Sequence, residues 1–131
     1  MLTWLLFYTS LFEAQKTASQ AVVDPGDIRA TIASMVAHGV HMLPIPENYY
    51  DDLEARTDLS PAEIEELAAL NVLYDRDANG VFLQVYTASL DCGFFFEIVQ
   101  RDGYAGYGAP NAGIRLAAQA RLAEAVTVLR Y

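Results

Sequence analysis

One glutamate stands in the most apolar part of this sequence. Glu97 lies two residues after Phe95 and two before Val99, so in a strand these three side chains share one face. Burying a carboxylate among apolar groups is costly unless it is paired or bound to a metal ion. The same spacing is equally compatible with a glutamate on the solvent-facing side of a strand. Glu97 is therefore the first candidate for chemistry, as a metal ligand.

The two histidines of the chain are the next candidates. A non-haem iron site needs two histidines and one carboxylate. His38 and His41 have a spacing of i, i+3, but Gly39 lies between them and predicts the end of a helix. We therefore expect His38 at the last helical turn and His41 beyond it, in surface or capping roles and not as metal ligands.

Two further patterns are excluded as sites. Asp75, Asp77 and Asn79 alternate as in a calcium-binding loop, but the twelfth position from Asp75, where such a loop needs glutamate, is Tyr86. The glycine-rich segment 103–108 lacks the lysine and hydroxyl residue of a phosphate-binding loop.

Composition narrows the class of protein. The 131 residues are 53% hydrophobic and carry 8 basic against 17 acidic residues, a net charge of −9. This balance excludes a disordered chain and argues against nucleic acid as a partner. Cys92 is the only cysteine, reads as a plain thiol, excludes an internal disulfide, and fits a cytoplasmic protein. The apolar run 2–8 lacks the flanks of a signal peptide and is too short for a membrane span, so no membrane partner is expected.

Local patterns predict the elements that must position these residues. We expect helices at 3–12, 28–38, 51–56, 61–69 and 112–129, and strands at 13–23, 72–74, 81–87 and 94–101. Asp27, Ser60 and Asn111 are the expected helix caps, and Pro44 and Pro46 predict a loop over 42–50. For the helix expected at 28–38, the expected core positions are Ile28, Ile32, Met35 and Val36. For the helix expected at 112–129, they are Ile114, Leu116, Ala117, Leu122 and Val126.

Four segments, in this order and spacing, resemble the C-terminal half of 4-hydroxyphenylpyruvate dioxygenases. They are LPIPENYYDDL (43–53), LYDRDANGVFLQVYT (73–87), FFFEIVQR (94–101) and GYGAPN (106–111), and the likeness runs over about residues 26–122. The resemblance implies an α+β fold of the vicinal oxygen chelate (glyoxalase/dioxygenase-like) class. That fold is built from paired βαβββ modules, here an incomplete pair with a mixed curved sheet and flanking helices.

The resemblance also implies a metal site. In the family, iron is held by two histidines and by the glutamate that corresponds to Glu97. One histidine lies on a strand before the helix that 3–12 resembles, and the other on a strand just before the helix that 27–37 resembles. Neither histidine is present here, and the chain reads as if a block were missing between Pro25 and Asp27. We therefore expect that iron, or another divalent metal, is not held tightly by this chain alone.

The resemblance assigns further residues to substrate. Gln84 and Tyr86 match a strand of the dioxygenases, and Tyr107 and Asn111 lie in their glycine-rich motif, so these four are the expected contacts of a small aromatic or 2-oxo acid. Where the dioxygenases carry an aromatic residue, this chain has Ala112.

The tail 111–125 is more like the dioxygenase-like domain fused behind a sugar-isomerase-type barrel in bacterial 3-dehydroshikimate dehydratases, in which the dehydration belongs to the barrel. We expect a single, truncated domain over 1–131, with 1–24 resembling the first module and 27–131 the second. The leading interpretation is such a module, with an incomplete metal site and no activity of its own. An iron-dependent 2-oxo acid dioxygenase and a non-catalytic assembly module are the alternatives.

A homodimer is also expected, because the missing strands would leave sheet edges unpaired and the aromatic residues exceed what one small sheet buries. The aromatic residues concerned are Phe82, Tyr86, Phe94, Phe95 and Phe96.

Overall fold

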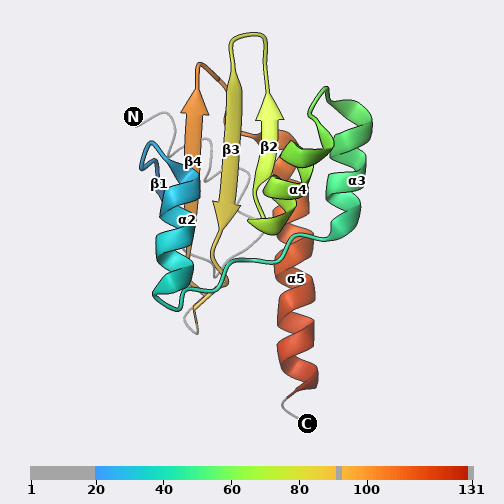
Figure 1. Cartoon of the computed structure of the whole chain (residues 1–131). Coiled ribbons are helices and arrows are strands. Elements are labelled where there is room, and N and C mark those ends of the chain that lie inside the picture. Colours follow the sequence, from blue (N-terminus) through green and yellow to red (C-terminus); the bar gives the residue numbers. More distant parts are fainter. Residues whose placement is uncertain (1–19, 91–92, 130–131) are drawn as a thin grey trace.

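The computed structural model describes residues 20–90 and 93–129 (Figure 1). The helix expected at 3–12, the first part of the strand expected at 13–23, and Cys92 lie outside these residues. The elements are β1 (Gln20–Val23), α2 (Ile28–Ala37), α3 (Glu47–Arg56), α4 (Pro61–Ala69), β2 (Leu73–Arg76), β3 (Val81–Tyr86), β4 (Phe95–Asp102), the 3₁₀ turn η1 (Ala109–Asn111) and α5 (Ala112–Val128). Within these residues, no helix is long and apolar enough to cross a bilayer.

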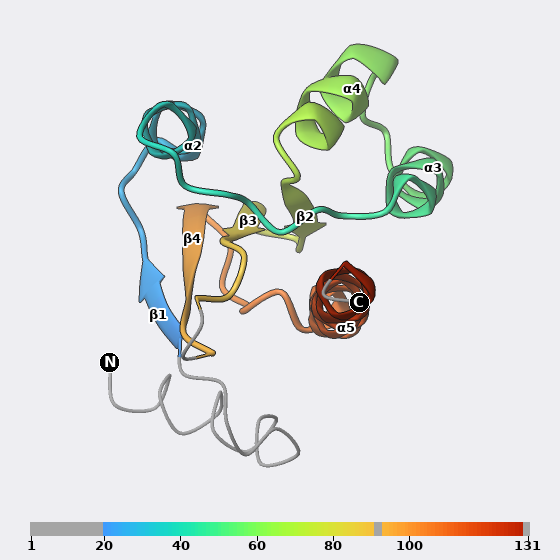
Figure 2. The same ribbon diagram turned by 90° about the horizontal axis from the view of Figure 1, so that it is seen from below.

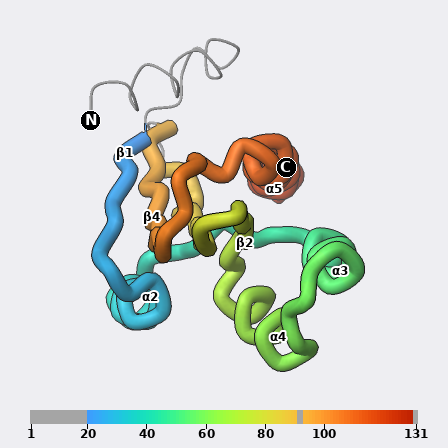
Figure 3. The backbone as a smooth tube through the Cα atoms, turned by 90° about the horizontal axis from the view of Figure 1, so that it is seen from above, coloured from blue at the N-terminus to red at the C-terminus, as the bar shows by residue number. Residues whose placement is uncertain are grey.

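One mixed sheet organises the fold. Its four strands have the order β1-β4-β3-β2, with β1 parallel to β4 and the other neighbours antiparallel. Seen along the sheet, α2 and α4 lie on one side and α5 lies on the other (Figures 2 and 3). The expected α+β class, with a mixed sheet and flanking helices, is confirmed.

Local signals explain where two helices begin and end. The Asp27 side chain accepts a hydrogen bond from the backbone N–H of Ala30 at 3.0 Å and caps α2, and Gly39 follows its end with a φ of 84°. Ser60 and Glu63 form a capping box at the start of α4, where Pro61 is the first helical residue. These predictions are confirmed. They could be made from the sequence because each depends only on residues within one turn of the helix end.

The loop expected over 42–50 is wrong in its second half. Helix α3 begins at Glu47, directly after Pro46, four residues before the predicted turn at 51–56. A proline disfavours helix in the residue that precedes it, but it leaves the residues that follow free to start one. The correction matters for the site, because it places Tyr49 on a buried helical face.

The predicted core stripes are wrong at three positions. Val36 and Val126 are 54% and 45% exposed, and Ala117 is also exposed. On α5 the buried residues are Arg115 and Ala118. The C-terminal turns of α5 extend past the end of the sheet, so none of the described strands covers them (Figure 1).

Strand β1 enters the sheet directly before α2. It lies beside β4, with Val22 opposite Glu97 and Gln20 opposite Phe95. The described strands therefore follow the order β-α-β-β-β along the chain, with two additional helices in the first connection. The division into modules at 1–24 and 27–131 stays a prediction, but β1 shares its sheet with the later strands.

Candidate functional site

Glu97 is completely buried at the centre of a polar cluster. Its Oε1 accepts hydrogen bonds from Gln84 Nε2 at 3.0 Å and from the Tyr86 hydroxyl at 3.2 Å. Its Oε2 accepts one from Gln20 Nε2 at 2.9 Å. Its exposed fraction is 0%, which excludes the solvent-facing alternative. Three donors directed at one carboxylate offset part of the cost of burying it.

Sheet register explains why these side chains meet. Tyr86 lies directly opposite Glu97 in the β3–β4 ladder, and Gln84 is two residues away on the same face. Gln20 lies opposite Phe95 in the parallel β1–β4 ladder, so its side chain also belongs to the face of Glu97. Strand parity thus predicts the proximity of Glu97, Gln84 and Tyr86.

A chain of hydrogen bonds fixes the Oε1 side of the carboxylate. The backbone N–H of Tyr74 donates to the Tyr49 hydroxyl at 2.9 Å, and that hydroxyl donates to Asn111 Oδ1 at 3.1 Å. Asn111 Nδ2 donates to Gln84 Oε1 at 3.0 Å, which leaves Gln84 Nε2 to face Glu97. Each amide is therefore oriented by its predecessor. Burial raises the pKa of Tyr49 to about 12, so its hydroxyl keeps its proton at neutral pH.

Asn111 is not the helix cap that the sequence predicts. It precedes α5, but its side chain makes no capping hydrogen bond. The amide instead serves the buried network, which includes a bond from Nδ2 to the Tyr74 carbonyl at 3.3 Å. A residue that is 1% exposed gains more from satisfying buried groups than from capping a helix start.

The glycine-rich loop positions Asn111. Gly108 has a φ of 68°, and its carbonyl accepts a hydrogen bond from the Asn111 N–H at 2.9 Å. A Cβ at Gly108 would overlap the side-chain amide of Gln84, so glycine lets the loop approach β3. Tyr107 lies half-buried next to Gly108, and its role as a substrate contact stays a prediction.

Three residues of this region are not among the residues predicted from the sequence. Arg115 is 2% exposed, and its guanidinium carbon lies 5.7 Å from the ring centroid of Tyr86 and 5.4 Å from that of Phe95. The spacing Asn111, Arg115, Ala118 follows one helical face and could have indicated it. Tyr49 and Gln20, the other two, carry no local signal, because their partners are remote in sequence.

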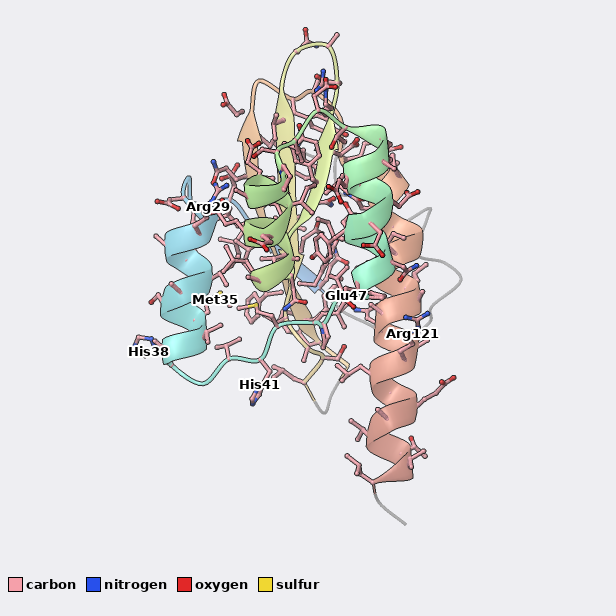
Figure 4. The ribbon with its side chains drawn as sticks, turned by 45° about the vertical axis from the view of Figure 1, so that its right-hand side comes forward. Arg29, Met35, His38, His41, Glu47 and Arg121 are labelled. Carbon is pink, nitrogen blue, oxygen red and sulfur yellow. The ribbon has the colours of Figure 1, made fainter. Side chains whose placement is uncertain are left out.

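The histidines lie elsewhere. His38 and His41 are both exposed, and the His38 ring contacts the Ser34 carbonyl at 2.7 Å. Figure 4 shows them at the end of α2 and on the segment that follows it. Helix α2 covers the sheet face opposite α5, whereas Arg115 of α5 covers the face of Glu97. Their absence from a metal site stays a prediction that this placement supports.

The described residues do not fit the iron site that the resemblance implies. Both carboxylate oxygens of Glu97 already accept hydrogen bonds from amide and phenol groups. Both histidines of the chain are exposed at the end of α2 and on the segment that follows it, whereas Glu97 is fully buried. Among residues 20–90 and 93–129, no three His, Cys, Asp or Glu side chains gather as a metal site would require.

Comparison with known proteins identifies the sequence relationship. No family model matches the chain. It is 54% identical over 100 residues to a 3-dehydroshikimate dehydratase of Pseudomonas putida, a match that covers 75% of this chain and 16% of that protein. It is 37% identical over 91 residues to a 4-hydroxyphenylpyruvate dioxygenase of Caenorhabditis briggsae, covering 65% of this chain and 23% of the relative.

Solved structures agree. A xylose isomerase-like TIM barrel/4-hydroxyphenylpyruvate dioxygenase fusion protein superimposes with a TM-score of 0.74 at 45% identity, covering 87% of this chain and 20% of that one. A mutant of 4-hydroxymandelate synthase from Streptomyces coelicolor gives a TM-score of 0.66 at 35% identity, covering 76% of this chain and 28% of that one. The chain thus has the vicinal oxygen chelate fold. Its sequence is similar to 4-hydroxyphenylpyruvate dioxygenases and to a 3-dehydroshikimate dehydratase, of which it spans about one-sixth.

Proposed function

We propose that this chain acts as the dioxygenase-like module of a 3-dehydroshikimate dehydratase-type protein, in the catabolism of quinate and shikimate, and is inactive alone. The observation that carries this proposal is the 54% identity to such an enzyme over a match that spans only 16% of it. The fusion protein supports it, because its name joins a barrel to a dioxygenase-like part. The site supports it as well, because two amides and one phenol donate hydrogen bonds to Glu97, and no histidine of the chain does so in the described contacts.

Association with the rest of such an enzyme tests the proposal. The purified chain is mixed with the Pseudomonas putida dehydratase from which the shared segment has been deleted, and complexes are measured by size-exclusion chromatography with light scattering. We expect a stable complex with the deleted enzyme and none with the intact one. Equal behaviour of the two would contradict a module role.

The dioxygenase alternative is tested separately. Oxygen uptake is followed with ferrous iron and 4-hydroxyphenylpyruvate as the aromatic 2-oxo acid. We expect no uptake above that of Glu97→Gln. Uptake that depends on Glu97 would show that this chain is a dioxygenase with ligands from elsewhere.

The assembly alternative takes the form of a homodimer. Strand β1 is an edge of the sheet in the described residues, and Val22 and Val23 on it are 51% and 44% exposed. Phe96, opposite Ala21, is 38% exposed. Fewer aromatic side chains of the sheet are exposed than the sequence predicts, because Phe82, Tyr86 and Phe95 are buried. Sedimentation velocity at micromolar concentration distinguishes a dimer from a folded monomer, and the monomer would refute this proposal.

We propose a cytoplasmic location and a small-molecule acid as the ligand. The first is supported by a single cysteine in 131 residues. The second is supported by the likeness to 4-hydroxyphenylpyruvate dioxygenases, whose name gives an aromatic 2-oxo acid as substrate. Fractionation of the producing cell and calorimetric titration with 2-oxo acids test the two statements.

A further inference from the structure

We infer that the amide of Gln20 takes the place of a metal ligand at Glu97, so that this site is held together by hydrogen bonds and is independent of metal. The inference is a disagreement between the family's iron and the residues of this chain. It does not depend on the proposed link to dehydratases.

The position of Gln20 is the first argument. It lies on β1, the strand directly before α2, where the resemblance puts a histidine ligand. Its Nε2 reaches Glu97 Oε2 at 2.9 Å across the parallel ladder. An amide N–H donates a hydrogen bond and cannot coordinate a cation through that nitrogen. The contact therefore satisfies the carboxylate without a metal.

The second argument is that the amide fits this position imperfectly. Gln20 Oε1 is buried and accepts no hydrogen bond from the described part of the chain. Buried acceptors are normally satisfied, and leaving one unpaired is costly. Only Nε2 of the Gln20 amide makes a hydrogen bond among the described residues. This is expected where the surroundings fit a side chain that makes a single contact to Glu97.

The third argument is the asymmetry of the carboxylate's surroundings. Oε1 is held by Gln84, which Asn111 and Tyr49 orient in turn. Oε2 accepts a hydrogen bond from Gln20 on β1, which is an edge strand among the described residues. Glu97 is thus held on its Oε1 side by an oriented network, while its contact with Gln20 on the Oε2 side comes from the edge strand of the described sheet. Changing that residue should decide whether the site takes a cation.

The test compares the wild-type chain with Gln20→His, using Co²⁺ as the probe. Imidazole and carboxylate together offer two ligands to a first-row transition metal. We expect Gln20→His to bind Co²⁺ at least about tenfold more tightly than wild type, with visible absorption bands and a rise in Tm of several degrees. We expect the wild-type chain to show neither change.

Three controls make the result decisive. Glu97→Gln added to Gln20→His should abolish the Co²⁺ response, whereas His38→Ala with His41→Ala should leave it in place. Gln20→Glu serves as the test if the histidine variant does not fold, because it has the size of the native residue. It places two carboxylates together, so it should be less stable than wild type, and Mn²⁺ should restore its stability. One equivalent of metal on the wild-type chain, lost in Glu97→Gln, would overturn the inference. So would a folded Gln20→His without a metal response.

Discussion

The two faces of strands β3 and β4 are equally buried but are stabilised by different means. Toward α2, the strands present Leu83, Val85 and Ile98, whose exposed fractions are 7%, 0% and 2%. Toward α5, they present Gln84, Tyr86 and Glu97, with exposed fractions of 1%, 2% and 0%. Through these residues, one face presents an apolar core, and the other presents a polar network around a carboxylate, in which Gln20 Oε1 accepts no hydrogen bond from the described residues.

This difference shows that burial alone does not identify a core. An apolar face gains free energy from every group removed from water, and its members are interchangeable within limits of size. A polar face recovers its desolvation cost only if all its partners are present and oriented. The face toward α5 therefore accepts fewer kinds of side chain than the apolar face. A single substitution there can nevertheless lower the free energy of unfolding by less than one on the apolar face.

The largest expected effect is on the apolar face. Ile98→Ala should lower the free energy of unfolding by about 2–5 kcal/mol, because it removes a buried side chain and leaves a cavity. Urea denaturation followed by circular dichroism measures this change. Ile98→Val is the matched control and should cost about 0.5–1.5 kcal/mol. A loss for Ile98→Ala no greater than that of the control would contradict the description of this face.

A smaller effect is expected in the polar network. Asn111→Ala should cost about 1–3 kcal/mol, because it leaves Gln84 Oε1 without its donor and removes one of the two acceptors that the Tyr49 hydroxyl reaches. Asn111→Asp is the control: it keeps an acceptor for Tyr49 but has no donor for Gln84. If the aspartate variant is as stable as wild type, the bond to Gln84 does not orient that amide as we describe.

The smallest effect concerns pH. Tyr49 has a pKa of about 12 in the folded chain and 10.0 as its ordinary value, because burial disfavours the phenolate. The unfolded chain therefore loses this proton first, and stability should fall as pH rises from about 10 to 12. Tyr49→Phe should show a shallower decline over this window. Tyr104, whose pKa is also raised to about 12 by burial and by its bond to Asp75, keeps part of the slope in both proteins. Identical slopes would exclude Tyr49 as a contributor.

The sequence alone determined two helix starts, one helix end and the strand face that carries Glu97. Asp27 and Ser60 cap their helices, Gly39 lies just past the end of α2, and strand parity puts Glu97, Gln84 and Tyr86 on one face. Each depends on backbone geometry within a few residues, which side-chain type and spacing specify directly. The resemblance of four segments to the dioxygenases added the fold class.

Partners remote in sequence were decided only by tertiary structure. Tyr49 and Asn111 are 62 residues apart and share a buried hydrogen bond. Gln20 and Glu97 are 77 residues apart and share a part-buried one. Asn111 carries a local signal for a cap, but packing gives its amide to Gln84 instead. Arg115 is buried because α5 lies against the sheet face that holds Tyr86 and Phe95. Long-range pairing depends on how the elements pack, and that packing is a property of the whole chain and of no single segment.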